Sequence, residues 1–227
     1  MIAPAAPTRV TLAVNGTIQV SGLFEQPPES GVCMLLAHGA GAGMGHPFMQ
    51  SIAADLAQGG IATLRYQFPY MERHEKRPDA PPLCHATVRA AASMARDLMP
   101  NATLIAGGKS FGGRMTSQAQ ALRPLEHVRG LVFLGFPLHQ PNKPAAERAA
   151  HLSKIKIPLL FLQGTRDTLA ELDHLRPIIE GLQTLALLKV IDGADHSFHV
   201  LKRSGRTDDE VRAEMADAII AWSRTLS

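Results

Sequence analysis

Long runs of any one kind of residue are missing from this sequence of 227 residues. Its 23 basic and 20 acidic residues never form a block of like charges, so nothing indicates a surface for nucleic acid or a polybasic membrane anchor. No apolar run approaches the roughly 18 residues of a membrane span. The N-terminus also lacks the charged and then apolar segments of a secretory signal. We expect neither a nucleic-acid partner nor membrane association.

Cysteine is equally scarce. The sequence has two, Cys33 and Cys84, in unrelated contexts, and Cys33 lies inside an apolar run. We therefore expect no disulfide framework and infer a reducing, cytoplasmic location. Internal repeats, low-complexity segments and linkers are absent, and a hydrophobic content of 45% is enough for one substantial core. This predicts a single domain over residues 1–227, while the oligomeric state is not predicted.

The sequence is built instead from short apolar runs separated by helical stretches. In residues 8–26, apolar and polar residues alternate around Asn15-Gly16, a pair favoured in type I′ turns, which predicts an N-terminal antiparallel hairpin. Later runs are apolar throughout, as the strands of a parallel sheet covered on both faces require. These runs begin at residues 32, 61, 103, 131, 158 and 186. The sequence thus predicts an α/β fold with a mostly parallel, twisted sheet of about eight strands and helices on both faces.

Helices are expected between these strands. Helical patterns cover residues 46–60, 86–99 and 111–122, and a last helix follows a capping-box sequence at 207–210. The first of them places Phe48, Ile52 and Leu56 on one apolar face. Prolines cluster at 78–82 and 141–144, which is typical of surface loops.

The segment Gly108-Lys109-Ser110-Phe111-Gly112 fits two motifs. A phosphate-binding loop also ends in Gly-Lys-Ser, but it needs a glycine five residues before the Gly-Lys pair, where this sequence has Thr103. The other motif is G-x-S-x-G, the tight strand-to-helix turn that exposes a nucleophilic serine in hydrolases. Its glycines are needed because side chains there would collide with neighbouring backbone. We favour Ser110 as a nucleophile, and a glycine-rich turn with a solvated serine is the alternative.

A nucleophilic serine needs a histidine base and a carboxylate that orients this base. Asp167 lies in the turn after the strand that begins at residue 158, and His196 lies in the loop after the last strand. The order Ser, Asp, His, each just past a strand end, is that of α/β hydrolases. Asp192 and Asp195 are rival carboxylates on the histidine's own loop, where Asp195 is too near in sequence to face the imidazole easily. Taken singly, Asp167 is also explained as a turn residue or helix cap, and His196 as a surface histidine.

Acyl transfer also requires amide donors for an oxyanion. The candidates are the amide of Phe111, after the serine, and that of Ala40, in the loop after the third strand. The glycines of residues 39–45 fit G-x-G-x-x-G in no register, which argues against dinucleotide binding. His196 and His199 raise the question of a metal, but His-Glu-x-x-His is absent and neither cysteine has a ligand-like partner nearby. We expect no cofactor and no metal.

Four motifs, HGAGAG, GKSFGG, QGTRD and GADHSF, resemble the α/β-hydrolase superfamily, and the resemblance spans roughly residues 30–225. The sequences of these motifs are most similar to those of small, capless hydrolases of the dienelactone-hydrolase type, in particular the bacterial relatives of the testis-expressed and chromatin-complex hydrolase-like proteins. The resemblance implies an α/β-hydrolase fold with Ser110, Asp167 and His196 as a triad. It implies no substrate, because this fold also carries thioesterases, peptidases and inactive scaffolds. Dienelactone hydrolases use a cysteine nucleophile where this sequence has serine, so lactone hydrolysis does not carry over.

The substrate pocket is less well defined by the sequence. About 19 residues separate the strands that begin at 131 and 158, where larger relatives insert a cap, so we expect no large cap. The loop 65–82 should lie over the carboxyl edge of the sheet. Phe68, Tyr70 and Arg73 are therefore candidates for the pocket, and an exposed basic loop is the alternative. His38 is a further pocket candidate, although we favour a role in shaping the oxyanion loop.

These features together predict a serine hydrolase that cleaves a carboxylic ester or thioester of a small acyl group through an acyl-enzyme. The expected partner is a small-molecule substrate. A non-catalytic scaffold or binding protein with the same fold is the alternative function.

Overall fold

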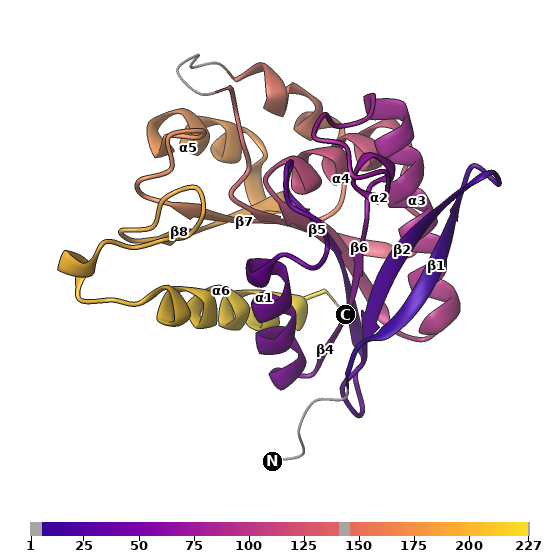
Figure 1. The fold of residues 1–227 in the computed structure, drawn as a ribbon. Coiled ribbons are helices and arrows are strands. Elements are labelled where there is room, and N and C mark those ends of the chain that lie inside the picture. Colours follow the sequence, from indigo (N-terminus) through magenta and orange to yellow (C-terminus); the bar gives the residue numbers. More distant parts are fainter. Residues whose placement is uncertain (1–5, 141–145, 227) are drawn as a thin grey trace.

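The computed structural model describes residues 6–140 and 146–226. A twisted sheet in the order β1-β2-β4-β3-β5-β6-β7-β8 runs through the molecule (Figure 1). Its strands are β1 Thr8–Val14, β2 Ile18–Glu25, β3 Val32–Ala37, β4 Ile61–Tyr66, β5 Thr103–Lys109, β6 Val128–Leu134, β7 Leu159–Gly164 and β8 Ala186–Ile191. Strands β1 and β2 pair antiparallel, β2 pairs antiparallel with β4, and all other pairs are parallel. The predicted mostly parallel sheet of eight strands is confirmed.

Helices cover both faces of this sheet. They are α1 Pro47–Gln58, α2 Pro69–Glu72, α3 Pro81–Leu98, α4 Phe111–Leu122, α5 Leu172–Gly181 and α6 Asp208–Ser223, with 3-10 turns at Glu147–Lys154, Gln183–Leu185 and Lys202–Ser204. Helices α1 and α6 lie side by side on one face, and α3, α4 and α5 pack on the other (Figure 1). Within the described residues no helix is both long and apolar enough to cross a membrane.

Unbroken apolar strands follow from this layering. Along β3, Cys33 and Leu35 face the core beneath α3 and α4, while Met34 and Leu36 face the core beneath α1 and α6. All four side chains are buried, because successive residues of a strand point to opposite faces and both faces are covered.

Local signals set several boundaries. Asn15 and Gly16 have φ values of 52° and 74°, and the Thr17 N–H donates to the Val14 carbonyl at 3.3 Å, so the expected hairpin turn forms. The Thr207 hydroxyl accepts from the Glu210 N–H, and the Glu210 carboxylate accepts from the Thr207 N–H, which completes the expected capping box of α6.

The proline-rich segment 78–82 differs from expectation. Pro81 is the first residue of α3, so this helix begins five residues before the predicted start at residue 86. Pro81 and Pro82 are therefore helical, whereas the sequence predicted a surface loop over residues 78–82. Proline suits this position because its missing N–H has no partner in the first helical turn anyway. The second proline cluster, 141–144, lies outside the described residues.

Candidate active site

The turn between β5 and α4 has the strained geometry of a nucleophile elbow. Ser110 has φ 49° and ψ −111°, and its N–H donates to the Leu134 carbonyl at 3.0 Å. A side chain at Gly108, whose φ is +153°, would overlap the Ala37 carbonyl, and a Cβ at Gly112 would lie 2.6 Å from the same oxygen. The two glycines are therefore needed because the elbow is pressed against the end of β3, as the motif predicts.

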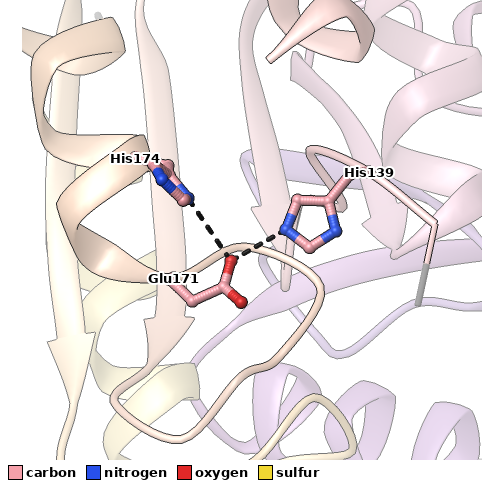
Figure 2. A group of neighbouring side chains, drawn as sticks. All are labelled: His139, Glu171 and His174. Carbon is pink, nitrogen blue, oxygen red and sulfur yellow. Dashed lines mark hydrogen bonds and ion pairs between the residues drawn. The ribbon is translucent and has the colours of Figure 1, made fainter. Parts of the chain in front are cut away.

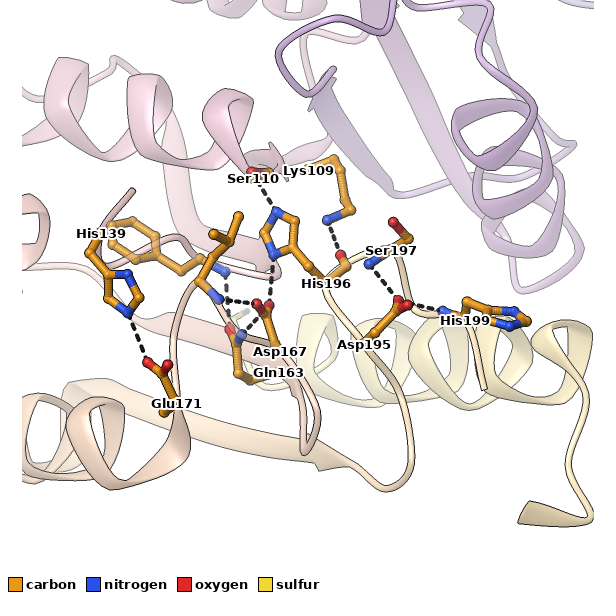
Figure 3. Close-up of polar contacts among 12 residues, drawn as sticks. Lys109, Ser110, His139, Gln163, Asp167, Glu171, Asp195, His196, Ser197 and His199 are labelled. Atoms are coloured by element: carbon orange, nitrogen blue, oxygen red, sulfur yellow. Dashed lines mark hydrogen bonds and ion pairs between the residues drawn. The ribbon is translucent and has the colours of Figure 1, made fainter. Parts of the chain in front are cut away.

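A hydrogen-bonded series runs from this serine to a buried carboxylate (Figure 3). Ser110 Oγ lies 2.8 Å from His196 Nε2, and His196 Nδ1 lies 2.7 Å from Asp167 Oδ2. Because a carboxylate can only accept, Nδ1 carries the proton and Nε2 accepts from the serine hydroxyl. The side chain of Asp167 is 1% exposed and that of His196 is 23% exposed. The serine hydroxyl thus faces the Nε2 atom of a partly exposed histidine.

Two further contacts fix the Asp167 carboxylate. Its Oδ2 atom also accepts a hydrogen bond from the Gln163 side-chain amide, and Oδ1 accepts from the Leu169 N–H at 2.8 Å. Both of these donors come from the carboxyl end of β7 or from the turn that follows it, so they stabilise a buried negative charge there.

The rival carboxylates serve other purposes. Asp195 Oδ1 accepts from the N–H groups of Ser197 and His199, at 2.8 and 3.0 Å, and so shapes the loop that carries His196. Asp192 lies 3.4 Å from the Thr165 hydroxyl. Of the three aspartates considered, Asp167 is the one that the structure brings to His196.

His38 holds the loop after β3 in place. Its Nδ1–H donates to the Gly39 carbonyl at 2.8 Å, and its Nε2 accepts from the Phe68 N–H at 3.0 Å. Burial lowers the pKa of His38 to about 4, since the charged form would lose its hydration, so the ring is neutral. Both ring nitrogens are occupied, and His38 therefore positions the loop that contains Ala40.

The amides of Ala40 and Phe111 lie on the two segments that meet at the serine. Phe111 is the first residue of α4, where an N–H has no partner within the helix. Within the described residues, neither amide donates to another backbone or side-chain group. Both are therefore available to a bound oxygen, and Ala40 lines the cavity beside Ser110.

A cavity of about 380 Å³ opens beside Ser110 and His196. It is lined by the loop after β3, the start of α1, the end of β5, the turn after β7 and the loop after β8, namely Gly39, Ala40, Ala42, His46, Phe48, Met49, Lys109, Leu169 and Ser197. Phe48 packs against the same core cluster as Ile52 and Leu56, as its place on the apolar face of the helix predicts. Its half-buried ring also lines the cavity and stacks on Phe198, with ring centroids 5.9 Å apart.

The pocket predicted from the loop 65–82 is corrected by the structure. Phe68 and Tyr70 are fully buried, and Phe68 packs edge-on against Phe111 with ring centroids 5.4 Å apart. Arg73 is exposed and pairs with Glu75 and Asp79, each at 2.7 Å. Neither these three residues nor His38 line the cavity, because the segment folds into α2 and turns its aromatic rings inward.

Sequence reasoning missed Lys109 as a residue of the site. Its ammonium donates to the His196 carbonyl (Figure 3). It also lies 5.2 Å from the centre of the Phe198 ring and lines the cavity. Burial lowers the pKa of Lys109 to about 8, and the charges of Asp167 and Asp195 oppose this shift. The available signal was a lysine that ends an otherwise apolar strand.

Comparisons with known proteins agree with this fold. The family model described as an alpha/beta hydrolase domain matches residues 30–224, and the chain belongs to this family. A lidless α/β serine hydrolase from Xanthomonas campestris is 21% identical, with 96% of each chain covered and a TM-score of 0.75. A dienelactone hydrolase from Anabaena variabilis is 23% identical, with 96% of this chain and 98% of that chain covered and a TM-score of 0.76.

The esterase domain of a Rhodothermus marinus protein has the same fold, with 15% identity, 97% of this chain and 99% of that chain covered, and a TM-score of 0.74. At these identities the structural likeness establishes the fold. The predicted α/β-hydrolase membership and the absence of a large cap are confirmed. The finer resemblance to the testis-expressed and chromatin-complex group stays a prediction.

Proposed function

We propose that this protein is a serine hydrolase that cleaves a carboxylic ester or thioester of a small acyl group. The observation that carries the proposal is the series Ser110–His196–Asp167, with contacts of 2.8 and 2.7 Å, at an elbow beside an open cavity. Family membership supports hydrolase chemistry, and the geometry supports serine as its nucleophile.

In the proposed reaction Ser110 Oγ attacks the carbonyl carbon while His196 Nε2 takes the hydroxyl proton. Asp167 stabilises the imidazolium that forms. The tetrahedral intermediate expels the alcohol or thiol, which receives the proton from His196, and leaves an acyl ester on Ser110. Water then attacks this ester with the same histidine as base, which releases the acid and restores the serine.

The negative oxygen of each tetrahedral intermediate would accept from the N–H groups of Ala40 and Phe111. Their availability supports this role, as does the close approach of the two segments at Gly112, where a Cβ would lie 2.6 Å from the carbonyl oxygens of Ala37 and His38. Rigid donors matter because they need no reorganisation when the charge develops.

A small acyl group fits the proposed site. The large apolar residues that line the cavity are Phe48, Met49 and Leu169, and no cap covers it within the residues that the structure describes. Ester and thioester differ only in the leaving atom, which the proposed chemistry accepts in either form. We further propose a single domain and a cytoplasmic location, which two free, buried cysteines support.

Turnover of p-nitrophenyl acetate and of an acetyl thioester tests this proposal. Ser110→Ala should lower kcat to the background rate. Ser117→Ala is the matched control. Ser117 lies in α4, the helix that follows the elbow, and its Oγ also lies 2.7 Å from a histidine nitrogen, His151 Nε2, but it does not line the cavity. We expect it to keep wild-type activity. Absence of turnover in a folded wild-type protein would support the alternative, a non-catalytic scaffold.

A further inference from the structure

Three potential metal ligands lie together outside the cavity (Figure 2). His139 follows β6, Glu171 is the residue before α5, and His174 lies in the first turn of α5. Glu171 Oε2 is 2.8 Å from His139 Nε2 and 3.5 Å from His174 Nδ1. All three ligand atoms lie within 4.8 Å of one another. Two nitrogens and one oxygen thus converge from two segments that are 32 residues apart at His139 and Glu171.

His139 is oriented for this arrangement. Its side chain is 1% exposed, and its Nδ1–H donates to the Gln140 carbonyl at 2.8 Å, so that Nε2 points at Glu171. Arg148 holds the backbone, because its guanidinium donates to the His139 carbonyl at 2.8 Å. A ring N–H bound to a backbone carbonyl is the usual support of a metal-binding histidine, since it fixes the tautomer and the ring plane.

The spacing also suits one small ion. Donor atoms that each bind zinc at about 2.0 to 2.1 Å are themselves separated by roughly 2.9 to 3.4 Å, and the observed 2.8 and 3.5 Å bracket this range.

The ligand types select the class of ion. Imidazole nitrogen suits zinc and the neighbouring transition metals, whereas calcium and magnesium require a shell of oxygens. Glu171 and His174 side chains are 44% and 54% exposed, which leaves room for water to complete the coordination. We propose that His139, Glu171 and His174 form a binding site for a divalent transition-metal ion such as Zn²⁺.

Such an ion would join the two segments that hold Asp167. The Leu169 carbonyl accepts from the N–H groups of Leu138 and His139, at 2.9 and 3.4 Å, and the Leu169 N–H donates to Asp167 Oδ1. The ion would therefore clamp the segment after β6 to the start of α5, and brace the turn between β7 and α5. This assignment departs from the expectation of no metal, which considered His196 and His199 and could not pair residues so far apart in sequence.

Calorimetric titration of the EDTA-treated full chain with Zn²⁺ tests the proposal. We expect one ion per chain, and at least a tenfold weaker affinity in His174→Ala and in Glu171→Gln. His174 is a suitable position because it is exposed on a helix surface, so its loss leaves the core intact. His199→Ala is the control: His199 Nδ1 also pairs with a carboxylate, Asp208, at 2.8 Å, but it belongs to no three-ligand group within the described residues.

Thermal unfolding gives a second readout. Zn²⁺ at a hundredfold excess over its dissociation constant should raise the melting temperature of the wild type and of His199→Ala by about 5 °C or more, because the ion binds the folded state. At the same Zn²⁺ concentration, His174→Ala should show at most about half of this shift. The proposal is overturned if the wild type binds no Zn²⁺, or if His174→Ala and Glu171→Gln bind it as tightly as the wild type. Neither readout depends on hydrolysis, so the proposed activity is tested separately.

Discussion

Replacing Asp167 with asparagine removes one acceptor from a position that needs two. Oδ2 accepts from both His196 Nδ1 and the Gln163 amide, and Oδ1 accepts from the Leu169 N–H. An asparagine amide has one oxygen and one NH₂ group. If its NH₂ faces His196, this group meets two other donors, the His196 Nδ1–H and the Gln163 amide. If the side-chain amide is flipped, its NH₂ meets the Leu169 N–H, which is also a donor.

The first orientation also reverses the histidine tautomer. An NH₂ at the Oδ2 position can only donate to Nδ1, so the imidazole proton moves to Nε2, which then cannot accept the Ser110 proton. We expect kcat to fall by about 10³ to 10⁴, which corresponds to roughly 4 to 5.5 kcal/mol of activation free energy. One buried N–H without a partner should cost about 1 to 3 kcal/mol of unfolding free energy. The fold should therefore persist with a lower melting temperature.

Steady-state hydrolysis of p-nitrophenyl acetate and calorimetric unfolding measure the two effects. Asp195→Asn is the control, since this carboxylate contacts the amides of Ser197 and His199 and does not contact the imidazole. The assignment of the carboxylate is wrong if Asp167→Asn keeps kcat within a few-fold of wild type. It is equally wrong if Asp195→Asn or Asp192→Asn causes the large loss instead.

Two further outcomes follow from the cavity. Lys109→Met removes the ammonium that donates to the His196 carbonyl and so holds the histidine loop. We expect kcat to fall about tenfold, which corresponds to the loss of one charged hydrogen bond. The Lys109 pKa of about 8 lies below its usual 10.5, so between these pH values the unfolded chain binds more protons than the folded chain. The unfolding free energy of the wild type should therefore rise relative to that of Lys109→Met from about pH 8 to pH 10.5. Parallel pH curves for the two proteins would contradict this. For p-nitrophenyl esters kcat/KM should peak at acetate to butyrate, because a methylene group contributes about 0.8 kcal/mol of binding free energy only where it is buried. A steady rise of kcat/KM up to twelve carbons would instead reveal an apolar channel.

Much of the fold was predictable because its signals are local. An apolar run such as Ile61–Tyr66 is buried only if helices cover both faces of its sheet. The glycines around Ser110 indicate a tight turn in which a side chain would overlap neighbouring backbone. The order of Ser110, Asp167 and His196 is likewise visible, since each follows a strand end. Parallel strands bring those ends to one edge of the sheet, where the structure places the three side chains in contact.

Features decided by long-range contacts were not predictable. Helix α5 was missed because Pro177 lies inside it, and proline normally ends a helical pattern. Phe68 and Tyr70 lie in a charged, proline-rich segment that gives no sign of burial, and their position depends on the contact between Phe68 and His38. The proposed metal ligands His139 and Glu171 meet only because β6 and β7 are neighbours in the sheet.

The central claim, that Ser110 is the nucleophile, is tested most directly by a fluorophosphonate probe and mass spectrometry of the intact protein. This probe forms a covalent bond with a serine only where a base has activated its hydroxyl. The folded wild type should gain one adduct, which peptide mapping locates at Ser110, and Ser110→Ala should gain none, while Ser117→Ala should label like the wild type. An adduct on folded Ser110→Ala, or a wild-type adduct at any other residue, would contradict the account.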